Sequence, residues 1–363
     1  MEMEMQAVNE GEQERDWAYL PPDMLNHIAK CLGEIFDFVR FRAVCHAWRT
    51  STPITDLPTQ FPWILENREH YPPDPNLRFY SLPFNKTYTI PAPRSLDKKY
   101  LLGPYSNGYM TTVSQQNHRP VSILNPLTNH EIYLSACPSV CDHHWIGPRQ
   151  NQRGEHVVIC YGRSCSKRPI LVFCHPGQSK WHKLKLGSAY KNCRHFYLRV
   201  ACFSVYRFAL ELQRLQISLM VFITLAYAVP PPCKDYWTKC SDVHLVEDSL
   251  GDILRVTNVQ IRFNVYRLDV GNKNGSSPCW VKVSDIGNQA IFIDMDGTFV
   301  LKAGELSQIE RNSIYLLETV YGGKRIPPSY NAWRTEIDTC KSERLQCPLK
   351  EPESWFVPNL HHL

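Results

Sequence analysis

The sequence lacks the short motifs by which many enzymes are recognised. It contains no Gly-x-Ser-x-Gly nucleophile elbow, no glycine-rich phosphate loop and no His-Glu-x-x-His helix. It also lacks a basic run that could follow a polyanion, because its 40 Lys and Arg and 35 Asp and Glu are spread along the chain. These absences argue against a recognisable catalytic site and against a nucleic-acid partner.

Long apolar runs are also missing. The most lipid-like stretch, residues 215–229, is about 15 residues long and stops at Pro230, whereas crossing a bilayer takes roughly 20 residues. We expect a buried pair of strands there and no membrane partner. Residues 1–16 are acidic and have neither the basic start nor the apolar centre of a signal peptide, so we expect a disordered tail.

The 14 Cys residues include no Cys-x-x-Cys pair. Without a secretory signal we expect them to stay reduced, which favours the cytoplasm, the nucleus or both. Four possible zinc ligands lie close together in the sequence: Cys137, Cys141, His143 and His144. Adjacent histidines on one strand cannot easily face one ion, and Asp294 and Asp296 lack the other ligands of a calcium loop. We expect no metal site and no cofactor.

The composition favours short strands and turns. With 27 Pro, 12% aromatic and 43% hydrophobic residues, the chain is typical of a mainly β protein. Its 363 residues are enough for a small module and a larger domain. The expected fold class is therefore mainly β with a small N-terminal α module.

Residues 20–49 have the spacing of short amphipathic helices. Leu25, Ile28 and Leu32 recur on one helical face, and Asp37 is in position to cap a second helix. Three short helices bury little surface by themselves, and isolated segments of this length are marginal in water. We expect their apolar ridge to be completed by a partner.

The block reads Leu-Pro-x-Asp-x-Leu-x-x-Ile, then Asp-Phe-x-Arg and Val-Cys-x-x-Trp-Arg. This pattern resembles the F-box, the motif that docks on the Skp adaptor of cullin-RING ubiquitin ligases, and places an F-box at residues 17–52. In the alternative interpretation these residues only pack against the rest of the chain. The resemblance implies that the following residues bind the adaptor: Leu20, Pro21, Leu25, Ile28, Phe38, Val44, Cys45 and Trp48.

After an expected linker at residues 53–76, the chain repeats a strand, a polar turn and a second strand. Clear copies begin near residues 78, 121, 170 and 263, and weaker ones near residues 208 and 333. The spacing of about 35 to 70 residues is typical of propeller blades, because neighbouring blades bury each other's faces. We expect a β-propeller-like domain of about six blades at residues 77–363, with two stacked sheets as the competing architecture.

The amino-acid sequence of this domain resembles that of the plant F-box proteins with a KIB-type β-propeller. Segments that carry the resemblance include Phe61-Pro62-Trp63-Ile64-Leu65, Leu124-Asn125-Pro126-Leu127-Thr128, Asn312-Ser313-Ile314-Tyr315 and Trp355-Phe356-Val357-Pro358-Asn359-Leu360. The sequence departs from this family's pattern in two places. Residues 202–236 are unusually apolar, and Asn288-Gln289 follows Gly287 where the family would have an acidic residue.

The two resemblances imply a non-catalytic substrate-recognition subunit of a Skp-cullin-F-box E3 ubiquitin ligase. Its expected partners are the Skp adaptor, through it the cullin-RING ligase, and an unknown target protein. The sequence assigns no substrate-binding residues. One alternative is a protein- or glycan-binding propeller without ligase function, and another is a propeller hydrolase, for which no acid and base pair stands out.

Overall fold

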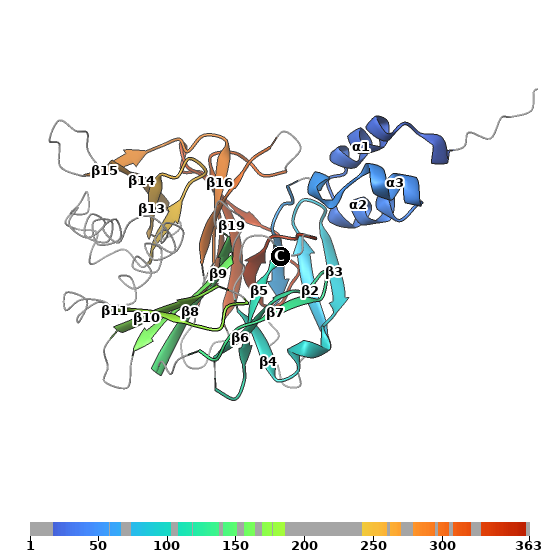
Figure 1. Cartoon of the computed structure of the whole chain (residues 1–363). Coiled ribbons are helices and arrows are strands. Elements are labelled where there is room, and N and C mark those ends of the chain that lie inside the picture. The colour runs from blue at the N-terminus through green and yellow to red at the C-terminus, as the bar shows by residue number, and fades with distance from the viewer. Residues whose placement is uncertain are drawn as a thin grey trace, which may run out of the picture. The chain divides into compact units, whose positions relative to one another are not determined.

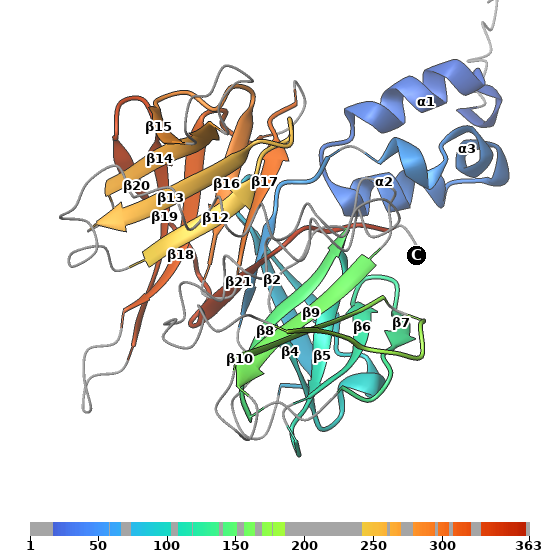
Figure 2. The same cartoon turned by 60° about the vertical axis from the view of Figure 1, so that its left-hand side comes forward.

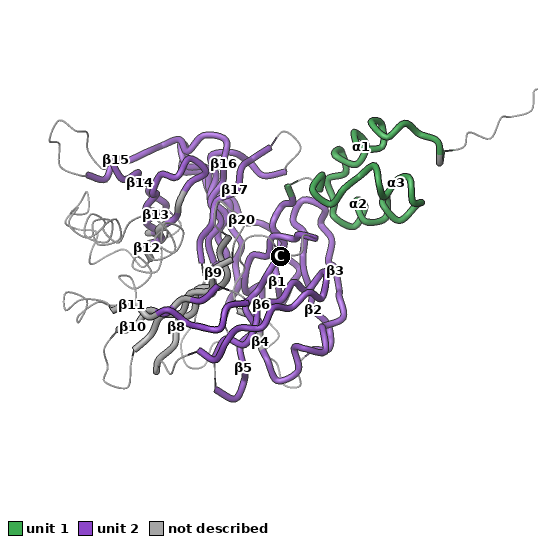
Figure 3. The backbone as a smooth tube through the Cα atoms, in the orientation of Figure 1, with its two compact units in different colours: residues 1–59 green, residues 60–363 purple. Residues whose placement is uncertain are grey.

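The computed structural model forms two compact units, residues 1–59 and residues 60–363 (Figure 3). Each unit has its own secondary structure, helical in the first and almost entirely β in the second (Figure 1). The described residues are 17–57, 59–66, 74–102, 108–117, 119–137, 141–150, 156–163, 169–175, 177–185, 242–259, 262–269, 279–294, 297–304, 308–320 and 328–360.

The first unit contains the three expected α-helices with a 3₁₀ turn on each side. In chain order the elements are η1 (Trp17–Tyr19), α1 (Pro22–Cys31), α2 (Ile35–Arg42), α3 (His46–Ser51) and η2 (Ile54–Asp56). Helix α1 begins with proline because a first-turn residue has no intrahelical use for its backbone N–H. The backbone N–H groups of Met24 and Leu25 both donate to the Pro21 carbonyl, at 3.0 and 3.1 Å.

The second helix begins earlier than the sequence pattern indicated. It starts at Ile35 with Glu34 before it, and no side chain caps it, so the expected cap by Asp37 is wrong. Asp37 instead lies in the first turn and pairs with Arg40 at 2.9 Å. The earlier start places Ile35 and Phe38 one turn apart, where both are buried.

The second unit forms five sheets within the described residues, rather than two stacked ones (Figure 2). Sheet A has the order β21 (Pro352–Phe356), β1 (Trp63–Glu66), β2 (Asn76–Ser81) and β3 (Lys86–Pro91). Sheet B has the order β4 (Lys99–Leu102), β5 (Met110–Ser114), β6 (Pro120–Asn125) and β7 (His130–Tyr133), after the 3₁₀ turn η3 (Arg94–Leu96). Sheet C has the order β11 (His182–Lys185), β10 (Pro169–Cys174), β9 (His156–Arg163) and β8 (Cys141–Gln150).

The remaining two sheets follow later in the chain. Sheet D has the order β12 (Asp242–Glu247), β13 (Ile253–Val259), β14 (Arg262–Asp269) and β15 (Cys279–Val283). Sheet E has the order β17 (Thr298–Lys302), β16 (Gln289–Ile293), β18 (Ser313–Val320), β19 (Ser329–Glu336) and β20 (Ser342–Leu345). Among the described strands, all pairings are antiparallel except that of β16 with β18.

The C-terminal strand returns to the first sheet. Strand β21 pairs with β1 in a register that sets Trp355 opposite Ile64, and it also lies beside β18 of sheet E. The expected linker is therefore wrong at residues 63–66, which form β1 between two partner strands. Three consecutive buried apolar side chains, from Trp63 to Leu65, explain why this segment belongs to a sheet.

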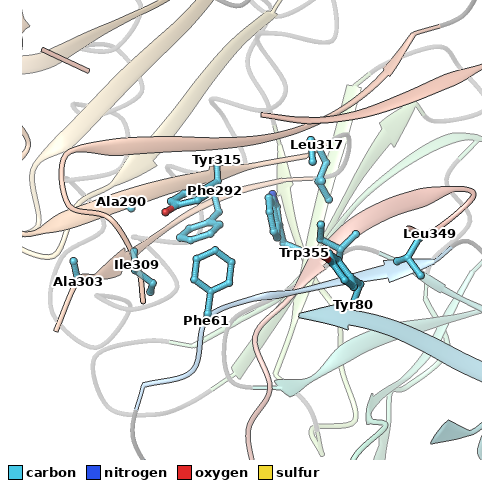
Figure 4. Close-up of a cluster of buried hydrophobic side chains, with 12 residues drawn as sticks. Phe61, Tyr80, Ala290, Phe292, Ala303, Ile309, Tyr315, Leu317, Leu349 and Trp355 are labelled. Carbon is cyan, nitrogen blue, oxygen red and sulfur yellow. The ribbon is translucent and has the colours of Figure 1, made fainter. Parts of the chain in front are cut away.

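Sheets A and E share the largest described cluster of buried side chains (Figure 4). The ring of Phe292 stacks on Tyr315 at 4.7 Å between centroids and on Phe299 at 5.2 Å. Phe61 and Trp355, from sheet A and the segment leading into it, meet Phe292 edge-on at 5.7 and 5.3 Å. This aromatic cluster stabilises the contact between the first sheet and the last.

Two expectations fall on residues 186–241, which lie outside the described residues. They are the weak repeat near residue 208 and the strand pair at residues 215–229, and the number of about six blades stays a prediction with them. In the part of the chain that the structure describes, no helix is long and apolar enough to cross a membrane.

Candidate docking surface

Helices α1 and α2 each bury one apolar face. Leu25 and Ala29 lie one turn apart on α1, and Ile35 and Phe38 occupy the corresponding positions on α2. All four side chains are almost completely buried. Leu25 and Phe38, expected to bind a partner, therefore stabilise the helices and expose no surface to one.

The other expected docking residues keep accessible surface. Pro21 is exposed and Val44 is 60% exposed. Four more are half-buried and are therefore accessible in part: Leu20, Ile28, Cys45 and Trp48. The helices themselves add further exposed apolar side chains, Met24 on α1 at 54% and Val39 on α2 at 41%.

Two aromatic residues extend this surface at its N-terminal end. Trp17 and Tyr19 are 61% and 84% exposed, which is unusual for aromatic side chains. The Trp48 indole N–H donates to the Trp17 carbonyl at 3.1 Å, and Phe41 packs on the Trp48 ring at 4.3 Å. The sequence analysis missed Trp17 and Tyr19, although their position just before the first helix was a usable signal.

Polar contacts hold the C-terminal end of the unit. The Asn26 amide donates to the Asp56 carboxylate and to the Ser51 carbonyl, which joins α1 to the end of α3 and to η2. The Thr52 hydroxyl donates to the Trp48 carbonyl at 2.6 Å and is itself buried. These contacts fix the C-terminal end of α3, and with it the backbone of Trp48.

A basic edge accompanies the apolar surface. Burial, and then the charge of Arg49, lower the pKa of Arg42, whose guanidinium lies 5.8 Å from the centre of the Phe38 ring. Arg49 donates to the Arg42 carbonyl at 3.5 Å. Two neighbouring guanidinium groups favour an acidic partner surface.

Only two of the metal-ligand candidates, Cys137 and Asp294, have described side chains. Cys137 is buried, while Cys141, His143 and His144 belong to β8, and their side chains lie outside the described part. Asp294 accepts hydrogen bonds from the backbone N–H groups of Gly297 and Trp355, and Asp296 lies outside the described residues. Over the described ranges no three His, Cys, Asp or Glu residues could hold one ion.

The comparisons with known proteins agree with this two-part architecture. A family profile described as KIB1-4 beta-propeller matches residues 79–338, more than half of the chain. A probable F-box protein of Arabidopsis thaliana is 24% identical over 401 residues, covering 96% of this chain and 97% of the relative. An F-box/kelch-repeat protein of the same plant is 24% identical over 334 residues, covering 88% of each chain.

A shorter match is much closer in sequence. Another F-box protein of Arabidopsis thaliana is 53% identical over 36 residues, which cover 10% of this chain and 9% of the relative. The mainly β fold with N-terminal helices is confirmed. The chain therefore belongs to the KIB1-4 beta-propeller family, among the plant F-box proteins that carry this domain.

Proposed function

We propose that this chain is the substrate-recognition subunit of a Skp-cullin-F-box E3 ubiquitin ligase. The helical unit docks on the Skp adaptor, and the propeller holds a target protein. The observation that carries the proposal is that one chain joins a KIB1-4 beta-propeller to a helical unit with Trp17, Tyr19 and Val44 exposed. Relatives that match nearly the whole chain and are named F-box proteins support it.

The exposed apolar surface supplies anchors for a complex. Burying one Leu, Val or aromatic side chain contributes about 1.5–3 kcal/mol, and association entropy removes part of the total. Micromolar affinity corresponds to about 8 kcal/mol, so after an association cost of at least about 4 kcal/mol it requires about four to eight such anchors, Val44 and Trp17 among them. Leu25 and Phe38 contribute indirectly, because they hold the helices that present these anchors.

In this proposal the chain catalyses nothing itself. It holds a target lysine near the ubiquitin-charged enzyme, so that an encounter between two molecules becomes effectively intramolecular. The chain acts in the cytoplasm, the nucleus or both, where its cysteines stay reduced.

Capture of the purified Skp adaptor by the full chain tests the docking assignment. We expect Val44→Glu to weaken capture about tenfold or more, because it places a charge in an interface that depends on apolar burial. Leu25→Asp is unsuitable, since it would unfold the helices around a buried side chain. The measurement is an adaptor titration followed by surface plasmon resonance.

Val281→Glu is the matched control. Val281 is 46% exposed on β15 of the propeller, so the same substitution there should leave adaptor affinity unchanged. Circular dichroism checks that both variants stay folded. Absence of adaptor binding by the unmodified chain, or equal binding by Val44→Glu and the unmodified chain, would refute the proposal.

A further inference from the structure

A pocket of about 390 Å³ lies between sheets A and E of the propeller. Its walls include Phe61 and Tyr80 on the side of sheet A, and Tyr315, Arg334 and Glu343 on the side of sheet E. Pockets that bind small ligands measure about 300–1,000 Å³ and combine apolar walls with a few polar groups. This pocket has both properties, and it is large enough for a peptide side chain.

The register of sheet E explains how the polar groups reach the pocket. Phe292 lies opposite Tyr315, Tyr315 opposite Arg334, and Arg334 opposite Glu343, so one cross-strand row runs from β16 to β20. The row begins with stacked, buried rings and ends with an ion pair of 2.8 Å between Arg334 and Glu343. Polarity therefore increases along the row toward the pocket.

The phenol groups of the pocket already have partners. The Tyr80 hydroxyl donates to the Asn85 side-chain oxygen at 2.9 Å, and the Tyr315 hydroxyl accepts from the Glu310 backbone N–H at 3.1 Å. Burial raises the pKa of Tyr80 and Tyr315, so both are neutral at pH 7. Tyr80 and Tyr315 are each only 3% exposed, so they form part of the apolar floor of the pocket and leave the accessible polar contact to the carboxylates beside Arg334.

The charges around Arg334 do not balance. Its guanidinium lies within 4 Å of three carboxylates, Glu343 at 2.8 Å and Glu310 and Glu336 each at 3.7 Å. One positive charge faces three negative charges, and the Glu343 side chain keeps 48% of its surface exposed. A positively charged ligand group placed beside the exposed Glu343 carboxylate would restore this balance.

We propose that this pocket binds a lysine or arginine side chain of the target protein, with its apolar stem against the half-buried Leu82, Pro83 and Leu345 and its charge beside the Glu343 carboxylate. The inference rests on the proposed function, since it assigns the substrate-binding site that function requires.

Selection of a random heptapeptide phage library on the full chain tests the pocket. We expect the enriched peptides to share a Lys or Arg. Their affinity, measured by fluorescence polarisation, should fall about threefold to tenfold in Glu343→Gln, which removes the charge from an exposed side chain. Gln346→Arg, a change at another exposed residue of the pocket, should weaken binding further by repulsion.

Glu318→Gln is the matched control. Glu318 lies on β18, three residues after Tyr315, and therefore faces the opposite side of sheet E. This variant should bind the peptides as the unmodified chain does. Replacing the basic residue of the peptide with citrulline or norleucine should reproduce the loss seen in Glu343→Gln.

Three outcomes would overturn the pocket assignment: no enriched peptide, enriched peptides without a basic residue, or equal binding by Glu343→Gln and the unmodified chain. Adaptor capture by Glu343→Gln is measured in parallel and should be normal. If the pocket assignment is wrong, the chain should therefore still bind the adaptor. Failure of the proposed function would instead appear as lost adaptor binding by a chain that still binds basic peptides.

Discussion

Gly108 has a φ of +78°, in the left-handed region that favours glycine. A Cβ at this position would approach the backbone nitrogen and oxygen of Asn359 at 3.0 Å. The Asn359 carbonyl also accepts a hydrogen bond from the Asn125 amide at 2.9 Å. At the residue scale, Gly108 therefore permits the segment after β21 to lie against sheet B.

Gly108→Ala should lower the free energy of unfolding by about 2–4 kcal/mol, through left-handed strain and a backbone clash. Gly287→Ala separates the two causes, because Gly287 has a φ of +74° but nothing within 4 Å of its Cβ position. It should cost only the strain, about 1–2 kcal/mol. Equal losses in urea unfolding of the two variants would show that the contact with Asn359 has no effect.

Glu131 is the centre of a polar network in sheet B. Burial alone would raise its pKa, but hydrogen bonds from Ser122, Lys99 and Ser95 and the charge of Lys99 outweigh burial and lower it. The Lys99 ammonium lies 3.0 Å from the carboxylate and 5.3 Å from the centre of the Tyr133 ring. The ionised form of Glu131 is therefore stabilised by folding.

This network predicts a specific pH dependence. Because the folded-state pKa of Glu131 is lowered, its contribution to stability is present above the unfolded value, about 4.3, and is lost as the pH falls through the folded value. The stability difference between the unmodified chain and Glu131→Gln should be constant from about pH 7 to pH 5 and should narrow below about pH 4. Urea unfolding of both chains across this pH range measures the stability difference. A difference that widens on acidification would contradict the lowered pKa of Glu131.

At the scale of the element, β21 makes contacts with two sheets. It supplies an edge strand to sheet A, and the buried Trp355 donates its indole N–H to the Ile293 carbonyl of sheet E at 3.0 Å. The Trp355 backbone N–H donates to the Asp294 carboxylate at 3.1 Å. A single short strand thus joins the beginning of the propeller to its last sheet.

Removal of residues 352–363 should therefore prevent the propeller from folding. The deletion exposes the edge of β1 and removes Trp355 and Phe356 from the core, a loss of about 3–5 kcal/mol for each large aromatic side chain. We expect the truncated chain to be insoluble or to lack a cooperative thermal transition. A soluble product with an unchanged melting temperature would show that β21 is dispensable.

The predicted repeat units correspond to the outer hairpins, by which we mean the two strands at one end of each sheet's strand order. The units near residues 78, 121, 170, 263 and 333 are the hairpins β2–β3, β6–β7, β10–β11, β14–β15 and β19–β20. A hairpin is recognisable in sequence because a turn joins two neighbouring strands. Strand β1, on the other side of sheet A, was missed because it is a short, buried run without a period.

At the scale of the whole molecule, the two units carry separate parts of the proposed function. The helical unit exposes Val44 and its neighbours for the adaptor, while the propeller forms the pocket beside Arg334 and Glu343. Because each variant changes an exposed residue of only one unit, the adaptor and peptide experiments test the two parts independently. Proximity of target and ligase requires both parts in one chain.

The sequence by itself determined the α and β content, the F-box pattern and the outer hairpins, because these depend on residues that are close in the chain. Helical spacing could not distinguish the buried Leu25 and Phe38 from the exposed Val44, since all are apolar. Tertiary structure alone decided which of them face outward, where β21 pairs, and that Tyr80 and Glu343 line one pocket. The physical reason is that these features arise from contacts between segments up to about three hundred residues apart, which no local period encodes.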